Sequence, residues 1–181
     1  MKVASAAIAS KMLGQGPQKM NSTISNSFID GQSLRTYRHF PNTGIRKSWA
    51  AGDASARGIM QAFISEVSEE IYPSALSAKA FGYNDVIMKE DTLNLQREMG
   101  SYVMDNILYK VNFPAEFHAQ TAVEAAVTLH PEVINRLEEV EKIVITTHES
   151  AIRIISKEGD LNNPADRDHC IQYMTAIGLL K

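Results

Sequence analysis

The stretch Lys142-Ile-Val-Ile-Thr-Thr147 decides the fold class predicted from this sequence. Five consecutive β-branched residues favour an extended strand over a helix, because such side chains fit the surface of a sheet. Residues 152–155 are a second, shorter strand candidate. Most of the preceding chain has the apolar spacing of helices. The sequence therefore predicts an α+β protein rather than an all-helical one.

Working back toward the N-terminus, we predict helices over residues 3–13, 20–29 and 115–129, and another from Ser48 onward. The small face of the first helix permits close packing, and its larger residues are expected to contact the core. The small residues are Ala6, Ala7 and Ser10, and the larger ones are Val3, Ile8 and Met12. The start of the chain also resembles a signal peptide, but its Ala- and Ser-rich run ends early at Lys11, which favours a core helix.

The last predicted helix lies beyond the strand candidates. Asn163 is expected to be its N-cap, with Pro164 at the first helical position. Residues 71–98 are the least regular part, which places a boundary there between a helical domain at 1–75 and an α+β domain at 76–181. Because the chain begins on one helix and ends within another, we expect a piece of a larger fold.

The charge of the chain is concentrated in one segment. The whole chain of 181 residues carries a net charge of −3, with 44% hydrophobic residues, as in an ordinary soluble globular protein. Residues 35–57 hold five of the 18 lysines and arginines and one of the 21 acids, so they carry +4 and the remainder −7. A pI near 6.0 argues against a nucleic-acid or membrane surface.

Other compositional features exclude whole classes of site. The single cysteine, Cys170, cannot form an internal disulfide or hold an iron–sulfur cluster with ligands from this chain alone. No apolar run is long enough to span a bilayer. The sequence also lacks a glycine-rich phosphate loop, a GxSxG elbow and a CxxC pair. We therefore expect no cofactor and no membrane segment.

The cationic segment is the first candidate site. Its side chains surround the turn at residues 41–44 and precede a helix start, which also favours anions. The cations and the histidine around the turn are Arg35, Arg38, His39, Arg46 and Lys47. Arginine forks match carboxylates, so the segment suits a substrate with several of them. A solvated loop paired with the surplus acids of the chain is the alternative.

The second candidate site is Tyr109-Lys-Val-Asn-Phe-Pro-Ala-Glu-Phe-His-Ala-Gln-Thr121. Lys110 offers a charge clamp, and Glu116 and His118 at a helix start offer a proton carrier. A capping histidine is the structural alternative for His118.

We interpret His130 and His148 as structural. The run Asp166-Arg-Asp-His-Cys170 has metal-ligand residue types, but its consecutive side chains face different sides of a helix, which disfavours a metal site.

Seven strings distributed over nearly the whole chain resemble the MmgE/PrpD family, and within it the branch that dehydrates 2-methylcitrate. They are Asp30-Gly-Gln-Ser-Leu-Arg-Thr-Tyr-Arg-His39, Pro41-Asn-Thr-Gly44, Arg46-Lys-Ser-Trp-Ala-Ala-Gly-Asp53, Gly100-Ser-Tyr-Val-Met104, Phe113-Pro-Ala-Glu-Phe-His118, Gln120-Thr-Ala-Val-Glu-Ala-Ala126 and Leu161-Asn-Asn-Pro-Ala-Asp-Arg-Asp-His-Cys-Ile-Gln-Tyr-Met174. The resemblance implies a fragment from the middle of the family sequence, with the end of a helical domain followed by the start of a smaller α+β lid domain.

The resemblance implies a lyase that converts 2-methylcitrate to 2-methyl-cis-aconitate in propionate breakdown through the methylcitrate cycle, without an iron–sulfur cluster. It implies that Lys110 and His118 are catalytic, and that the cationic segment, including Arg57, binds the tricarboxylate. Ala56-Arg57 replaces the Lys-His pair of the related decarboxylases, which argues against decarboxylation. It also implies a homodimer, located in the cytoplasm of a bacterium or the mitochondrial matrix of a eukaryote.

Two other functions remain open from the sequence. The chain could be a catalytically incomplete remnant that binds tricarboxylates or pairs with a full-length homologue, because the family's principal acid–base residues lie mainly before the part that this chain resembles. Nucleic-acid binding through the cationic segment is the weakest alternative, since only Tyr37, Phe40 and Trp49 are interleaved with its charges.

Overall fold

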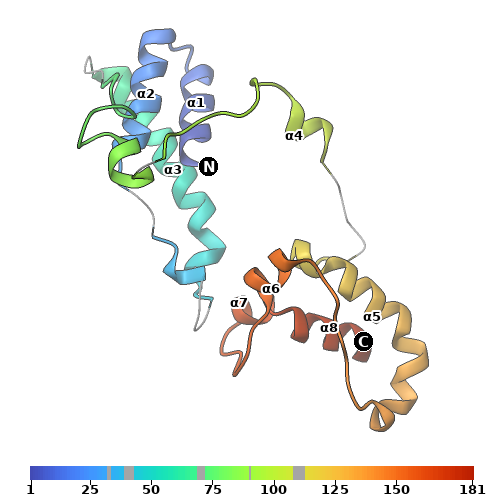
Figure 1. Cartoon of the computed structure of the whole chain (residues 1–181). Coiled ribbons are helices and arrows are strands. Elements are labelled where there is room, and N and C mark those ends of the chain that lie inside the picture. The colour runs from blue at the N-terminus through green and yellow to red at the C-terminus, as the bar shows by residue number, and fades with distance from the viewer. Residues whose placement is uncertain (32–33, 39–42, 69–71, 90, 108–112) are drawn as a thin grey trace. The chain divides into compact units, whose positions relative to one another are not determined.

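The computed structural model describes residues 1–31, 34–38, 43–68, 72–89, 91–107 and 113–181. Within these ranges every regular element is helical (Figure 1). The chain forms two compact units, one of residues Met1–Leu34 and Ser48–Gly100, the other of residues Arg35–Lys47 and Ser101–Lys181. No helix in the described ranges is long and apolar enough to cross a membrane.

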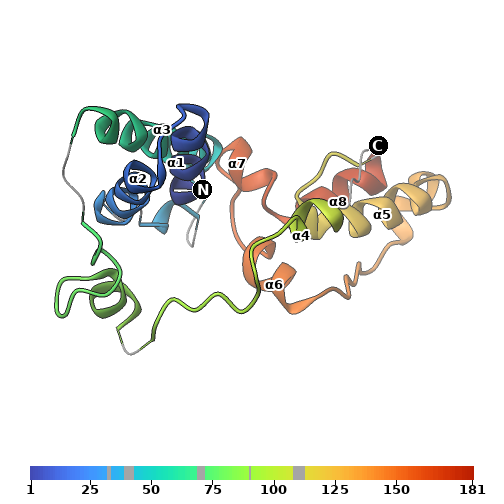
Figure 2. The ribbon, with the colours of Figure 1, turned by 90° about the horizontal axis from the view of Figure 1, so that it is seen from above.

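Three helices, α1 (Lys2–Met12), α2 (Pro17–Ile29) and most of α3 (Arg46–Val67), form the core of the first unit (Figure 2). Their contacts use small side chains: Ala6 and Ser10 of α1 are fully buried, as is Ala62 of α3. A Cβ atom built on Gly58 would lie 2.3 Å from the carbonyl oxygen of Lys2, so α3 meets α1 backbone to backbone. The predicted helix over residues 3–13 is confirmed, as is the burial of two of its small residues.

A single buried amide ties the three helices together. The Gln15 side chain follows α1, and its Nε2 donates hydrogen bonds of 2.8 Å to the carbonyl of Ala62 and to the carboxylate of Glu66. Its Oε1 accepts hydrogen bonds from the hydroxyls of Ser10 and Thr23, at 2.7 and 3.1 Å. All four hydrogen-bonding positions of the amide are therefore filled, which removes the penalty for burying it.

The Glu66 carboxylate gives the first unit a pH dependence. Its pKa lies below the ordinary 4.5, chiefly because Gln15 donates a hydrogen bond to it, and further because of Lys19, at 3.2 Å. A lowered folded-state pKa means that the charged form contributes stability above the ordinary pKa, and that this contribution is lost as the pH falls through the folded-state pKa.

We therefore expect the stability difference between the wild type and Glu66→Gln to shrink as the pH falls from about 7 to about 3, across the carboxyl range. Glutamine keeps the hydrogen-bond acceptor and removes the charge. Urea unfolding at several pH values measures the difference. Glu132→Gln, at an exposed glutamate, is the matched control, and a difference for Glu66→Gln that grows on acidification would contradict the assignment.

Two of the three larger apolar residues of α1 do not have the predicted role, whereas Val3 is half-buried. Ile8 and Met12 were expected in the core but are 60% and 83% exposed. They line a groove with Phe63 of α3, so the apolar sides of the two helices face the groove rather than each other. The expectation was wrong because the close approach at Gly58 brings small residues inward and turns the bulky ones outward.

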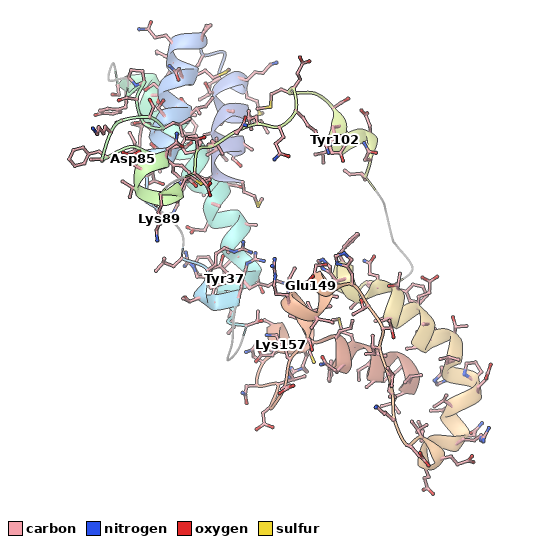
Figure 3. The ribbon with its side chains drawn as sticks, viewed as in Figure 1. Tyr37, Asp85, Lys89, Tyr102, Glu149 and Lys157 are labelled. Carbon is pink, nitrogen blue, oxygen red and sulfur yellow. The ribbon has the colours of Figure 1, made fainter. Side chains whose placement is uncertain are left out.

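Among the described residues that follow α3 in the first unit is a π-helical turn, η2 (Asn84–Met88). Asp85, labelled in Figure 3, accepts a 2.7 Å hydrogen bond from the amide of Ala80, whose φ of 67° lies in the left-handed region. The Tyr83 ring packs edge-on against Phe28 of α2, with the ring centroids 5.2 Å apart. This aromatic contact fixes the irregular segment against the helices.

Two long helices, α5 (Gln120–Val133) and α8 (Ile171–Leu180), lie side by side in the second unit (Figures 1 and 2). A Cβ atom on Gly178 would lie 3.0 Å from the Cβ of Ala126, so the two helices are closely packed. The other elements are short: α4 (Tyr102–Asp105), η3 (Phe117–Ala119), η4 (Ile134–Glu139), α6 (Glu149–Ile155) and α7 (Pro164–Arg167). The buried core consists of Ala119, Ala151, Ile155 and Ile171.

The two predicted strands have different outcomes. Residues 152–155 are not a strand but the last residues of α6, whose start is capped by the His148 side chain, which accepts a 3.1 Å hydrogen bond from the amide of Ser150. This cap overrides the weak strand preference of four residues. Residues 142–147 form neither helix nor strand, although Ile145 packs against the core.

The predicted cap of the C-terminal region is confirmed, since Asn163 accepts a hydrogen bond from the amide of Asp166.

Candidate functional site

The cationic segment enters the second unit through one short turn. Residues Thr36–Arg38 form the 3₁₀ turn η1, and the first turn of α3 supplies Arg46 and Lys47. The guanidinium carbons of Arg38 and Arg46 lie 5.7 and 5.9 Å from the centroid of the Tyr37 ring. These cation–π contacts hold two arginines at one aromatic side chain.

A buried carboxylate anchors this segment to the C-terminal part of the unit. Asp166 of α7 is fully buried and accepts a 2.7 Å hydrogen bond from the amide of Thr43. Lys157, labelled in Figure 3, lies 3.5 Å from the same carboxylate and also donates to the Thr43 hydroxyl. Asn163 donates a 2.8 Å hydrogen bond to the other oxygen of Asp166. The anchor thus joins two strings that are far apart in the sequence.

The anchored segment lines a cleft of about 1000 Å³ within the second unit. Its cations include Arg38, Lys47 and Arg167, and its acids are Glu116 and Asp168. Phe113, Met174 and other apolar residues form much of the remaining wall. A cleft of this size with convergent charges on an apolar surface is suited to a small charged ligand. The Nε of Arg38 is buried and has no hydrogen-bond partner among the described residues.

One wall of the cleft carries a cluster of three charged or titratable side chains. The Nδ1 atom of His169 lies 2.6 Å from the Asp168 carboxylate and 3.2 Å from the Nζ of Lys47. Lys47 is also 3.7 Å from the second oxygen of Asp168. The first turn of α3 and the segment between α7 and α8 therefore meet at this wall.

A second carboxylate–histidine pair precedes α5. Glu116 caps η3 by accepting a 2.7 Å hydrogen bond from the His118 amide, and its other oxygen lies 3.0 Å from the Nδ1 of His118. Glu116 lines the cleft, whereas His118 is not one of the lining residues. The carboxylate therefore fixes the orientation of the imidazole ring.

The structure therefore brings parts of both predicted sites together. Arg38, Lys47 and Glu116 line one cleft, and Arg46 shares the Tyr37 ring with Arg38. Arg35 is exposed. His39 and Lys110, predicted to bind substrate and to act in catalysis, lie outside the described residues.

Arg57 has a different environment from the other predicted cations. It belongs to the first unit, where it lies 3.3 Å from Asp53 and 3.9 Å from Asp30. Its charge is therefore shared between two carboxylates of that unit.

Sequence reasoning missed the functional setting of Asp168 and His169. Both occur in the run that was considered only as a metal site, and among the described residues no group of three potential ligands is arranged to hold a metal ion. The available signal was the acid next to a histidine, a pattern that suits proton transfer as well as metal binding. Lys47, the residue that completes the cluster, lies 122 positions earlier in the chain.

In the part of the chain that the structure describes, the fold is helical and one cleft carries several charged side chains. Residues 1–96 match the model of the MmgE/PrpD N-terminal domain, and residues 113–181 match that of the MmgE/PrpD C-terminal domain. The chain belongs to the MmgE/PrpD family, which confirms the resemblance described above.

Relatives from bacteria and fungi match nearly the whole chain. The 2-methylcitrate dehydratase of Salmonella typhimurium is 55% identical over 183 residues, covering 99% of this chain and 38% of the relative. The mitochondrial 2-methylcitrate dehydratase of Yarrowia lipolytica is 52% identical over 184 residues, covering 99% and 35%. A 2-methylcitrate dehydratase-like protein of Aspergillus oryzae is 40% identical over 185 residues, covering 100% and 37%. The chain spans less than two fifths of the length of these relatives.

Proposed function

We propose that this chain supplies part of the substrate site of a 2-methylcitrate dehydratase, a carbon–oxygen lyase that converts 2-methylcitrate to 2-methyl-cis-aconitate. The observation that carries the proposal is the cation-lined cleft of the second unit, in a chain 55% identical to a protein of that name over 99% of its length. A tricarboxylate needs several cations around it, and Arg38, Lys47 and Arg167 are spaced along the wall of this cleft.

The arginines orient the substrate. A guanidinium donates two parallel hydrogen bonds to a carboxylate, which fixes both the position and the plane of that group. Arg38 is already held against the Tyr37 ring, so less side-chain freedom is lost when it binds an anion. Lys47, which lines the same cleft, provides a more compact charge.

The elimination needs a base and an acid. The base removes a proton from the carbon next to a carboxylate, the released electron pair forms the carbon–carbon double bond, and the hydroxyl leaves as water with a proton from the acid. We assign His118 as a proton carrier of this reaction, oriented by Glu116 at 3.0 Å. Nearby cations stabilise the negative charge that develops on the carboxylate beside the deprotonated carbon.

The remaining assignments stay predictions. They are catalysis by Lys110, substrate binding by Arg35, His39, Arg46 and Arg57, the boundary between residues 75 and 76, the α+β character of the lid domain, a homodimer, and a location in the bacterial cytoplasm or the mitochondrial matrix.

A turnover assay tests the proposal. The purified chain is mixed with 2-methylcitrate, with and without a complementing N-terminal half of a homologous dehydratase, and the absorbance of the unsaturated product is followed. We expect turnover in the complemented sample. Binding of the tricarboxylate without turnover would favour the incomplete-remnant hypothesis, and turnover that persists in His118→Gln at the wild-type rate would contradict the role of His118.

Arg38→Gln is expected to weaken 2-methylcitrate binding about 10- to 100-fold, because a charge-assisted hydrogen bond contributes about 1.5–3 kcal/mol. Isothermal titration calorimetry on the purified chain measures the dissociation constant. Arg153→Gln removes an exposed arginine of α6 that does not line the cleft, and it should bind as the wild type does. Equal affinities for the two variants would exclude Arg38 from the site.

A further inference from the structure

His169 contacts two side chains of opposite charge through one ring nitrogen. Its Nδ1 atom is 2.6 Å from an oxygen of Asp168 and 3.2 Å from the Nζ of Lys47. The His169 side chain is largely buried, with 13% of its surface exposed, and it lines the same cleft as Arg38 and Arg167. The ring is therefore fixed in place at a wall that also carries cations.

The two contacts of this nitrogen exclude each other chemically. A lysine ammonium can only donate, so Nδ1 must be unprotonated to accept from Lys47. A carboxylate can only accept, so Nδ1 must carry a proton to donate to Asp168. The ring thus has two hydrogen-bonding states, and the local balance of charge determines which one is populated.

We propose that His169 binds a carboxylate group of the ligand as an imidazolium, and that the site takes up a proton when a tricarboxylate enters the cleft. This rests on the function proposed above and adds a specific role for His169 and Asp168. The bound anion attracts the ammonium of Lys47, while Asp168 accepts a hydrogen bond from the protonated Nδ1. The second ring nitrogen then carries a hydrogen and donates to the ligand.

The charges around the ring change when the ligand binds. The lining of the cleft carries the cations Arg38, Lys47, Arg167 and Lys181 and the carboxylates Asp168 and Glu116. A ligand with three carboxylates adds negative charge next to the ring, which stabilises the imidazolium. Binding and protonation are therefore linked, and each favours the other.

The linkage has a defined sign. Above the ordinary histidine pKa of about 6.5, a complex that requires the protonated ring must recruit a proton from solution. The dissociation constant of the tricarboxylate should then rise with pH, by up to about tenfold per pH unit for one proton.

Calorimetric titration of the purified chain with 2-methylcitrate near neutral pH, in two buffers of different ionisation enthalpy, measures the proton uptake directly. We expect the wild type to take up as much as one proton for each ligand bound. His169→Gln should take up few protons and bind the ligand about tenfold more weakly, and Asp168→Asn should take up fewer protons than the wild type. His148→Gln is the matched control, because His148 caps α6 in the same unit without lining the cleft, and it should retain the full uptake.

The outcomes separate the two proposals. Binding without proton uptake, or uptake unchanged in His169→Gln, would overturn the role of His169 and leave the dehydratase proposal intact. Proton-linked binding without turnover in the complemented assay would overturn the dehydratase proposal alone. Failure of the wild-type chain to bind 2-methylcitrate at all contradicts both. Circular dichroism of each variant shows whether it has folded.

Discussion

Replacing Asp166 with alanine is expected to lower the free energy of unfolding of the second unit by about 3–5 kcal/mol, the range for breaking one side of a buried ion pair. Asp166 is fully buried and pairs with Lys157, whose side chain is 14% exposed. Its loss leaves the Lys157 charge without this partner and removes the acceptor of the Thr43 amide. Hydrogen exchange of the amides in α7 and α8 measures the change.

Two further variants make this prediction specific. Asp160→Ala changes an exposed aspartate near the same helix, and it should alter stability by no more than about 0.5 kcal/mol. Lys157→Met combined with Asp166→Ala removes both charges and should recover part of the loss, since a buried pair can often be replaced by apolar side chains. If Asp166→Ala alone is as stable as the wild type, the anchor does not stabilise the second unit.

Gly58→Ala should destabilise the first unit by about 1–3 kcal/mol, the typical effect of overpacking. The added methyl group would lie 2.3 Å from the Lys2 carbonyl oxygen and 2.9 Å from the Ala6 nitrogen, both of which are backbone atoms. Relief therefore requires α1 and α3 to move apart, which also loosens the contacts of Ser10. Urea unfolding followed by the fluorescence of Trp49, the single tryptophan, measures the loss.

The same helix provides the matched control. Gly52 of α3 has nothing within 4 Å of an added Cβ atom. Gly52→Ala should therefore raise stability by up to about 1 kcal/mol, the difference in helix propensity between the two residues. If Gly58→Ala lowers the free energy of unfolding and Gly52→Ala raises it, packing is the cause of the loss at Gly58. Stabilisation by both substitutions would contradict the close approach of α1 and α3.

Local signals predicted the helices well. The Asn163 cap followed by Pro164 was predicted from neighbouring residues, and the structure confirms the cap. The prediction was possible because the hydrogen bond of the cap spans only three positions. The burial of Ala6 and Ser10 followed from their small size and helical spacing. Residues 152–155 were misassigned, since four β-branched and apolar residues do not distinguish a strand from a helix end without knowledge of the cap.

The site was predicted only in part, because its components come from distant places. The sequence indicated that Arg38 and Lys47 face an anion, and the structure places both on one cleft. It gave no indication that His169 would meet Lys47, since no local pattern connects residues 122 positions apart. Asp166 was considered only within a run of metal-ligand residue types, and no local pattern indicated its burial or its pairing with Lys157.

The anchor between Thr43 and Asp166 also constrains how the chain can fold during its synthesis. The two residues are 123 positions apart, and a ribosome adds about 5–20 residues per second. The cationic segment therefore leaves the ribosome roughly 6–25 s before its acceptor does, an interval longer than most elementary folding events. Throughout that interval the segment lacks the contacts that Asp166 and Lys157 make with Thr43 in the folded unit.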